Sequence, residues 1–114
     1  MDHRIEYDEF ERISTHLLAY DQNIPVGTAR WRKTENGIKL ERFAVVPSYR
    51  GKGVGSALLK AALDNVLKTN TSYIYLHAQN QVIPFYEKFG FVVEGEEFEE
   101  ASILHHKMIF SPEN

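Results

Sequence analysis

The stretch from Val45 to Ser56 limits the possible folds more than any other part of the chain. An apolar run with strand character precedes it and a helical pattern follows it, and Gly51, Gly53 and Gly55 stand at every second position between them. The first amides of a helix have no intrahelical partner, and the helix dipole favours an anion there. Glycine lets the backbone approach a ligand closely and adopt positive φ. A strand, a glycine-rich turn and a helix in this order therefore indicate a phosphate-binding loop.

The spacing of these glycines excludes two common phosphate motifs and fits a third. A P-loop needs four residues between its first glycine and a Gly-Lys-Ser/Thr ending, and none of the glycines offers this. A dinucleotide fingerprint needs a third glycine at the sixth position, where this chain has Ser56. The pattern that fits is Arg-x-x-Gly-x-Gly, formed by Arg50, Gly53 and Gly55, and Arg50 and Lys52 can add positive charge beside a phosphate. The alternative interpretation is a flexible helix start with no ligand.

Periodicity predicts one α/β domain over residues 1–114, which is the size of a single small domain. We expect strands at residues 15–20, 26–32, 38–46, 72–78, 91–93 and 102–110, a long helix at 53–68 and a short helix at 84–89. These elements predict a mixed, mostly antiparallel sheet with helices on its faces, and the crossover from strand 38–46 to strand 72–78 should be parallel and right-handed.

Several local signals support these boundaries. The long helix carries polar residues at every fourth position and apolar residues elsewhere, Leu67 included, so it should be mostly buried. Asn36-Gly37 predicts a hairpin turn, because both residues tolerate positive φ, and Gly90 predicts a helix C-cap. The stretch 94–100, with five glutamates, indicates an acidic, solvated loop; the alternative is that its charge attracts a cationic amine.

Composition excludes several classes of protein. The chain has no cysteine, which excludes a disulfide framework, a thiolate metal site and a cysteine nucleophile. No apolar run approaches the ~18 residues of a membrane span, and the first residues lack a signal-peptide core. The net charge is −3 and no basic face is evident, which argues against nucleic acid as a partner. We therefore expect a cytoplasmic protein that binds neither membrane nor nucleic acid.

A second motif turns the phosphate loop into a resemblance to a known family. The segment Phe85–Phe91, with the sequence Phe-Tyr-Glu-Lys-Phe-Gly-Phe, resembles the Phe-Tyr-Glu-Lys-x-Gly-Phe signature of the GNAT superfamily of N-acetyltransferases, and the Arg-x-x-Gly-x-Gly loop resembles its pyrophosphate loop. Shorter stretches are similar to a small bacterial branch of that superfamily, so the resemblance covers about residues 8–110: Asp8–Phe10, His16–Tyr20, Pro25–Arg30 and Leu76–Gln79. The resemblance implies a GNAT-like fold, acetyl-CoA as co-substrate and acetyl transfer to a primary amine of a small molecule or peptide.

The resemblance also implies which residues contact the cofactor. The backbone of the strand before the loop would pair with pantetheine, and the loop itself would hold the pyrophosphate. Gln79 stands where the family usually has an asparagine, and both amides can hydrogen-bond to the cofactor. The full set is Phe43, Ala44, Val45, Arg50, Gly51, Lys52, Gly53, Val54, Gly55, Ser56 and Gln79.

For catalysis, the resemblance places Tyr86 at the position that protonates the departing thiolate, a role that suits a phenol of pKa near ~10. The alternative is a packed tyrosine on a short helix. Glu41 is our candidate base, and its alternative is a carboxylate paired with Arg42 or Lys39. Many family members carry a glutamate where this chain has Ile74.

Three histidines, His77, His105 and His106, are alternative bases, because an imidazole titrates near neutrality. His105 and His106 should point to opposite faces of a strand, so they cannot easily share a metal ion, and we expect no metal.

The start of the chain departs from the family pattern, in which a strand and two helices precede the first hairpin. Only residues 1–14 precede the first expected strand here, too few for all three elements. We therefore expect a missing edge strand and a homodimer that covers the exposed surface. The alternative is one short helix over residues 1–14, with Ile5, Phe10 and Ile13 inward. The same departure motivates an alternative function, an acyl-CoA-binding sensor without transferase activity; a domain with no ligand is a third interpretation.

Overall fold

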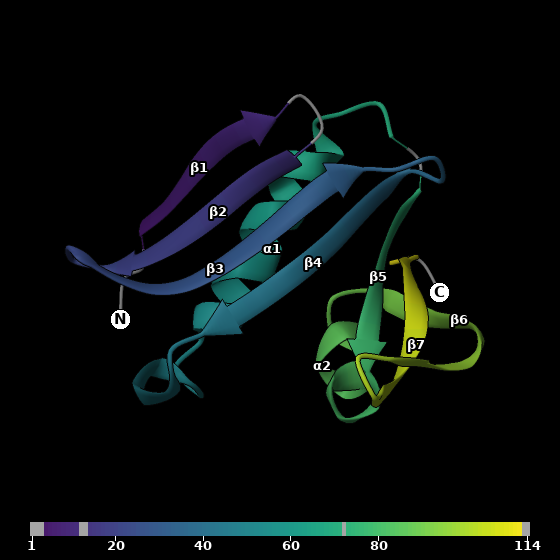
Figure 1. Cartoon of the computed structure of the whole chain (residues 1–114). Coiled ribbons are helices and arrows are strands. Elements are labelled where there is room, and N and C mark those ends of the chain that lie inside the picture. Colours follow the sequence, from purple (N-terminus) through teal and green to yellow (C-terminus); the bar gives the residue numbers. More distant parts are fainter. Residues whose placement is uncertain (1–3, 12–13, 72, 113–114) are drawn as a thin grey trace. The chain divides into compact units, whose positions relative to one another are not determined.

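The computed structural model describes residues 4–11, 14–71 and 73–112. Within them the chain forms seven strands and two α-helices, with two short 3₁₀ turns (Figure 1). The order is β1 (Arg4–Glu11), β2 (Ser14–Asp21), β3 (Ile24–Lys33), β4 (Ile38–Val45), η1 (Pro47–Tyr49), α1 (Val54–Leu67), β5 (Ile74–Gln79), η2 (Asn80–Val82), α2 (Ile83–Glu87), β6 (Phe91–Glu100) and β7 (Ile103–Phe110).

The chain divides into two compact units, the N-terminal unit (residues 1–71) and the C-terminal unit (residues 72–114). The predicted α/β class with mostly antiparallel strands is confirmed. The parallel crossover and the single domain over residues 1–114 stay predictions.

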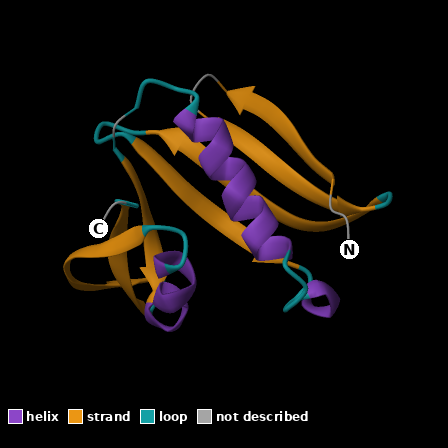
Figure 2. Cartoon of the chain, turned by 180° about the vertical axis from the view of Figure 1, so that it is seen from behind, coloured by secondary structure: helices purple, strands orange, loops and turns teal. Residues whose placement is uncertain are grey.

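In the N-terminal unit, β1, β2, β3 and β4 pair in this order and every pair is antiparallel. Figure 2 shows α1 lying across one face of these strands. The core between helix and sheet is apolar and almost completely buried: Leu17, Ala29, Leu40, Val54, Leu58, Leu59 and Ala62. The indole N–H of Trp31 on β3 donates a hydrogen bond of 2.6 Å to Oδ1 of Asn65 on α1, so a polar contact also ties the helix to the sheet.

Gly27 lets α1 approach the sheet closely. A Cβ atom at this position would lie 2.8 Å from Cγ1 of Val54 and 3.0 Å from Cδ1 of Leu58. Val54 is the first residue of α1, so the absence of a side chain at Gly27 determines how near the start of the helix lies to β3.

The long helix agrees with its prediction except at one residue. It spans Val54–Leu67, and the polar residues Lys60, Asp64 and Lys68 are exposed. Leu67 is also exposed, to 53%, although it was expected among the buried residues. Leu67 follows Lys60 by seven residues, which is nearly two helical turns, so it lies on the same solvent-exposed side of the helix as Lys60.

Both turns predicted in the N-terminal unit are present, but the second has other central residues than predicted. Gln22, in the turn between β2 and β3, has φ of 57°. The hairpin between β3 and β4 is closed by backbone hydrogen bonds between Thr34 and Gly37. Glu35 and Asn36 are therefore its central residues, and the predicted turn with Asn36-Gly37 at its centre is wrong.

The first described residues form a strand, not a helix. Arg4–Glu11 make β1, which pairs antiparallel with β2, and the Arg4 guanidinium lies 4.5 Å from the centroid of the Tyr20 ring. The alternative of one short helix is therefore wrong for these residues, because they pair with β2 from Arg4 to Glu11. The expected bare edge at β2 is wrong for the same reason. Ile5 is half-buried, and the side chains of Phe10 and Ile13 lie outside the described part. The homodimer stays a prediction.

In the C-terminal unit, β7 lies between β5 and β6 and pairs antiparallel with both. The short helix α2 contacts β5 and β6. It spans Ile83–Glu87 and is thus shorter than predicted. Its cap residue is Lys88, and Gly90 (φ 94°) lies two residues further on, so the predicted C-cap at Gly90 is displaced. Ser72, the expected first residue of strand 72–78, lies outside the described residues.

The predicted acidic loop over residues 94–100 is wrong, because these residues belong to β6. Their glutamates have partners: Glu94 Oε1 lies 3.3 Å from Lys107 Nζ, and Glu97 accepts a hydrogen bond of 2.6 Å from Asn80. Gly95, with φ of 86°, lies within an irregularity of the register between Glu94 and Phe98. Pairing with β7 therefore outweighs the low strand propensity of glutamate.

Candidate functional site

The glycine-rich loop joins β4 to α1 with its backbone open to solvent. Gly51 and Gly53 have φ of 78° and 85°, both are exposed, and a Cβ atom on either would meet no atom within 4 Å. Gly53 is the N-cap of α1, and no side chain caps the helix there. The first amides of α1, on Val54, Gly55 and Ser56, are thus available to an anion, as the phosphate-loop prediction requires.

Both predicted cations of the loop lie beside this backbone. Nε of Arg50 donates a hydrogen bond of 3.1 Å to the carbonyl of Val45, which ties the arginine to the end of β4 while its side chain stays exposed. Nζ of Lys52 lies 5.5 Å from the centroid of the Tyr49 ring. The two cations thus lie where the loop could present them to a phosphate, and their cofactor contacts stay predictions.

Tyr49 anchors the loop in a way that the sequence did not reveal. Its hydroxyl donates a hydrogen bond of 2.7 Å to Oδ2 of Asp21, the last residue of β2, and this bond to a carboxylate raises the pKa of Tyr49. The two residues are 28 positions apart, and only the antiparallel packing of the strands brings them together. The loop is thus tied to the β2–β3 turn.

The strand before the loop is bulged. The register pairs Thr28 with Ala44 but Arg30 with Glu41, so two residues of β4, Arg42 and Phe43, stand opposite one residue of β3. Arg42 has φ of 58°, an uncommon conformation for a residue other than glycine. A bulge bends a strand and interrupts its ladder. The bulge includes the first of the three residues predicted to pair with pantetheine, Phe43, Ala44 and Val45, whose cofactor contacts stay predictions.

Glu41 is a paired carboxylate. Its Oε2 accepts hydrogen bonds from Arg30, 2.7 Å from Nε, and from Arg32 Nε at 3.0 Å, while Oε1 lies 3.7 Å from Lys39 Nζ. Burial acts to raise the pKa of Glu41, but the hydrogen bonds and charges of Arg30 and Arg32 outweigh it and hold the pKa below its usual range. Of the two predicted ion-pair partners, Lys39 is present, and the structure adds Arg30 and Arg32. A carboxylate held this way is a weaker base.

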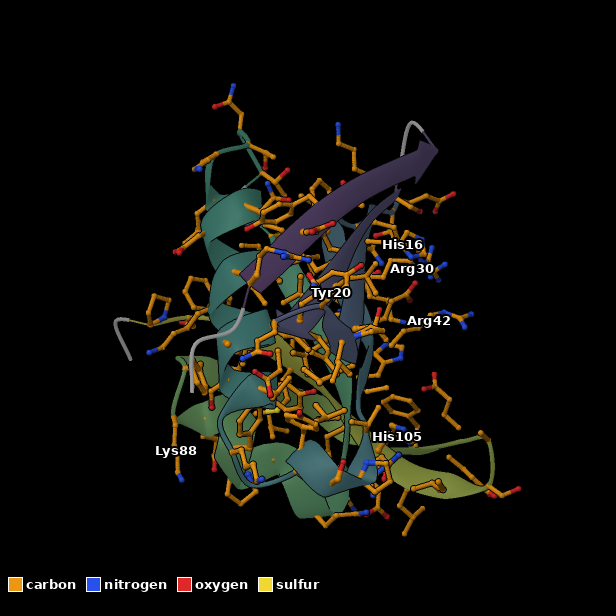
Figure 3. All side chains as sticks on the ribbon, turned by 90° about the vertical axis from the view of Figure 1, so that its left-hand side faces the viewer. His16, Tyr20, Arg30, Arg42, Lys88 and His105 are labelled. Carbon is orange, nitrogen blue, oxygen red and sulfur yellow. The ribbon has the colours of Figure 1, made fainter. Side chains whose placement is uncertain are left out.

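The sheet gathers cations that are scattered in the sequence. Arg30 and Arg32 on β3 lie opposite Glu41 and Lys39 on β4, next to the bulge at Arg42. We call Arg30, Arg32, Lys39 and Arg42 the basic face. The sequence alone showed no sign of this face. Alternation and cross-strand pairing place Arg30, Arg32 and Lys39 on one side of the sheet, and the bulge brings Arg42 to the same side (Figure 3).

In the C-terminal unit, Tyr86 is half-buried on α2 among aromatic rings. Its ring centroid lies 5.2 Å from that of Phe85 and 6.0 Å from that of Phe91, both in edge-to-face geometry. Burial raises the pKa of Tyr86, so its hydroxyl keeps its proton at neutral pH. A protonated hydroxyl can donate a proton but cannot act as a base, although the raised pKa makes it a weaker acid than a free phenol. Gln79 ends β5, and its Oε1 accepts a hydrogen bond of 3.0 Å from Gln81.

Two of the histidines share a carboxylate. Nδ1 of His77 lies 3.1 Å from Oε1 of Glu100, and Nε2 of the buried His105 lies 3.6 Å from Oε2 of the same residue. The His105 ring also stacks on Phe98 at 5.8 Å. Nδ1 of His106 instead lies 2.8 Å from Oδ1 of Asn80. His105 and His106 thus have different partners, as expected of neighbours on a strand.

Three further observations concern a possible base at residue 74, a possible metal site and possible membrane-spanning helices. Ile74 is buried and offers no titratable group where many family members have a glutamate. Among the described residues, no three His, Cys, Asp or Glu side chains gather closely enough to hold a metal ion. Neither of the two described α-helices is long and apolar enough to cross a membrane.

Comparisons with known proteins agree with this geometry. The sequence profile of the acetyltransferase (GNAT) domain matches residues 1–111. The chain is 41% identical over 105 residues to the uncharacterized N-acetyltransferase YjcF of Bacillus subtilis, and the match covers 91% of this chain and 75% of that protein. The crystal structure of an acyl-CoA N-acyltransferase from Pseudomonas aeruginosa is similar, with a TM-score of 0.77, 27% identity and coverage of 86% and 68% of the two chains. Arabidopsis thaliana Naa50, in complex with the bisubstrate analogue CoA-Ac-MVNAL, matches with a TM-score of 0.70, 33% identity and coverage of 84% and 72%.

Proposed function

Because the chain belongs to the GNAT acetyltransferase family, we propose that it transfers an acetyl group from acetyl-CoA to a primary amine of a small molecule or peptide. The observation that carries this proposal is the uncapped start of α1, where Gly51 and Gly53 have positive φ and Arg50 and Lys52 stand beside open backbone amides. That combination of amides, helix dipole and cations suits a pyrophosphate.

We assign the cofactor contacts in three groups. The backbone amides from Gly51 to Ser56, with the side chains of Arg50 and Lys52, hold the pyrophosphate. The backbone of Phe43, Ala44 and Val45, which follows the bulge, pairs with the pantetheine arm. The amide of Gln79 completes the set. Backbone groups fit this task because they are already ordered before the ligand arrives.

The reaction forms a carbon–nitrogen bond between the amine and the acetyl carbonyl, and the carbon–sulfur bond of the thioester breaks. The amine must lose a proton and the departing thiolate must gain one. We assign the second proton to the hydroxyl of Tyr86, which its raised pKa keeps protonated at neutral pH.

The base that takes the amine proton has more than one candidate. Glu41 is the sequence-based choice, but its lowered pKa makes it a weak proton acceptor. His77, His105 and His106 remain alternatives. The pH dependence of kcat/KM separates them, because a limb with an apparent pKa near ~6.5 indicates a histidine and a limb near or below ~4 indicates a carboxylate.

A screen of primary amines and peptides with acetyl-CoA tests the activity, with release of free thiol as the measurement. We expect turnover with at least one amine. Tyr86→Phe should bind acetyl-CoA normally and slow the transfer by about 10²-fold, as for a lost general acid. Tyr7→Phe, on an exposed tyrosine of β1, is the matched control and should keep the wild-type rate.

Two other outcomes would change the assignment. An unchanged rate in Tyr86→Phe would remove Tyr86 from the mechanism. Binding of acetyl-CoA without transfer to any amine would favour the acyl-CoA sensor over the enzyme. A cytoplasmic location and a homodimer stay predictions.

A further inference from the structure

Among the described side chains, the basic face carries more positive charge than its neighbours neutralise. Arg30, Arg32 and Lys39 all contact the single carboxylate of Glu41. Arg42 is exposed and makes no ion pair within the described residues. The register also places two acidic positions of β1 across β2 from the arginines: Asp8, opposite His16, lies across from Arg30, and Glu11, opposite Ser14, lies across from Arg32. Among the side chains of this face that the structure describes, four cations therefore stand against one carboxylate, that of Glu41, in a chain whose net charge is −3.

The unused donors point to solvent on the side of the sheet away from the helix. In Figure 3, His16, Arg30 and Arg42 project from the sheet on the side opposite α1. Arg30 directs Nε and Nη2 at Glu41, but Arg32 uses only Nε. The side chain of Arg32 is 35% exposed, so its two Nη groups can still bind an oxyanion in the bidentate geometry that guanidinium favours.

A purely structural ion pair would need only one of these cations. Burying a charge costs free energy unless it is compensated, so three cations converging on one half-buried carboxylate leave an excess that an incoming anion would relieve. Arg30 and Arg32 on β3 lie opposite Glu41 and Lys39, which precede Phe43 on β4 by two and four residues, about 7 to 13 Å at the rise of a strand. An acceptor with an anionic group several bonds from its amine can span this distance.

We propose that the basic face binds the carboxylate or phosphate group of the amine acceptor, so that the substrate class is a primary amine with an anionic tail. The inference rests on the proposed acetyl transfer to an amine. Arg32, with its free Nη groups, is the specificity-determining residue, and Arg30 and Arg42 add charge beside it.

Steady-state kinetics with three acceptors of equal chain length test the proposal: 6-aminohexanoate, 6-aminohexyl phosphate and hexylamine. We expect KM for the two anionic acceptors to be about tenfold below that for hexylamine, as for a charge-assisted hydrogen bond. Comparison of KM for 6-aminohexanoate and 6-aminohexyl phosphate shows whether the basic face prefers a carboxylate or a phosphate.

The variants assign the effect to the basic face. Arg32→Gln should raise KM for the anionic acceptors about tenfold more than it changes KM for hexylamine. Arg4→Gln removes an equally charged residue of the same sheet and should change neither, because Arg4 pairs with Glu6 and Tyr20 on β1 and β2. Equal KM for all three acceptors, or an equal effect of Arg32→Gln on all three, would overturn the proposal.

A binding measurement keeps this inference separate from the proposed function. Two-dimensional NMR of the arginine Nε–Hε resonances, recorded during titration with 6-aminohexanoate in the absence of acetyl-CoA, should shift the Arg32 signal in the wild type, and Arg4 should not respond. If no amine is acetylated, the proposed function fails while this titration still decides whether the face binds an anion. Identical responses to 6-aminohexanoate and to hexylamine would contradict it.

Discussion

Gly27→Ala should weaken both the fold and the phosphate loop. The new Cβ atom would lie 2.8 Å from Val54 Cγ1, 3.0 Å from Leu58 Cδ1 and 3.2 Å from the carbonyl oxygen of Ala44. Val54 is β-branched and stiff in a helix, and the carbonyl belongs to the sheet, so neither can yield easily. Overpacking of this kind costs about 1–3 kcal/mol. The lower entropy of the unfolded alanine chain offsets about 0.4–1 kcal/mol of that.

We therefore expect a net loss of about 1–2 kcal/mol in the free energy of unfolding, measured by urea denaturation. Val54 adjoins Gly53, so the same shift of α1 should raise KM for acetyl-CoA. The double variant Gly27→Ala/Val54→Ala makes room for the new methyl group, and its loss should be smaller than the sum of the two single losses by about 1 kcal/mol or more. Strict additivity, or a Gly27→Ala variant as stable as the wild type, would refute the close-packing argument.

Two further predictions concern Tyr49 and Glu41. Tyr49→Phe removes the hydrogen bond to Asp21, and we expect KM for acetyl-CoA to rise about fivefold with kcat unchanged, because the loop loses one of its attachments; an unchanged KM would show that this bond does not position the loop. Glu41→Gln should lower stability by about 1 kcal/mol, a value reduced for solvent screening. The folded-state pKa of Glu41 lies below its ordinary value of 4.5, so its contribution is present above that pH and is lost as pH falls through the lower value. Urea denaturation between pH 3 and 8 should show a difference from the wild type that is constant above about pH 5 and shrinks below it; a difference independent of pH would contradict the ion-pair account.

The features that depend on near neighbours in the sequence could be predicted. The helix α1 follows from a polar stripe with helical period, and its open N-terminus follows from the glycines at 51, 53 and 55. A hairpin between β3 and β4 was predicted for the same local reason. Its central residues are Glu35 and Asn36 and not Asn36 and Gly37, because the hydrogen bonds between Thr34 and Gly37 depend on how the two strands pair.

The features that depend on strand register could not be predicted. The glutamates of β6 indicate a loop when taken alone, and only their pairing with β7, where Glu94 meets Lys107, makes them a strand. Glu41 could be matched to Lys39 by proximity in sequence, but Arg30 and Arg32 are 11 and 9 residues away. Their convergence depends on the β3–β4 register, and no local signal marks the bulge at Arg42.

Binding of acetyl-CoA, measured by isothermal titration calorimetry, tests the central claim most directly. We predict that the wild type binds one molecule per chain and that Gly53→Asp does not bind, because it places a negative charge against the pyrophosphate. Gly53→Asn is the matched control: Asn and Asp both tolerate the αL conformation of Gly53 (φ 85°), so its affinity should fall less. No binding to the folded wild type, or equal binding to the Asp and Asn variants, would contradict the assignment of this loop to the cofactor.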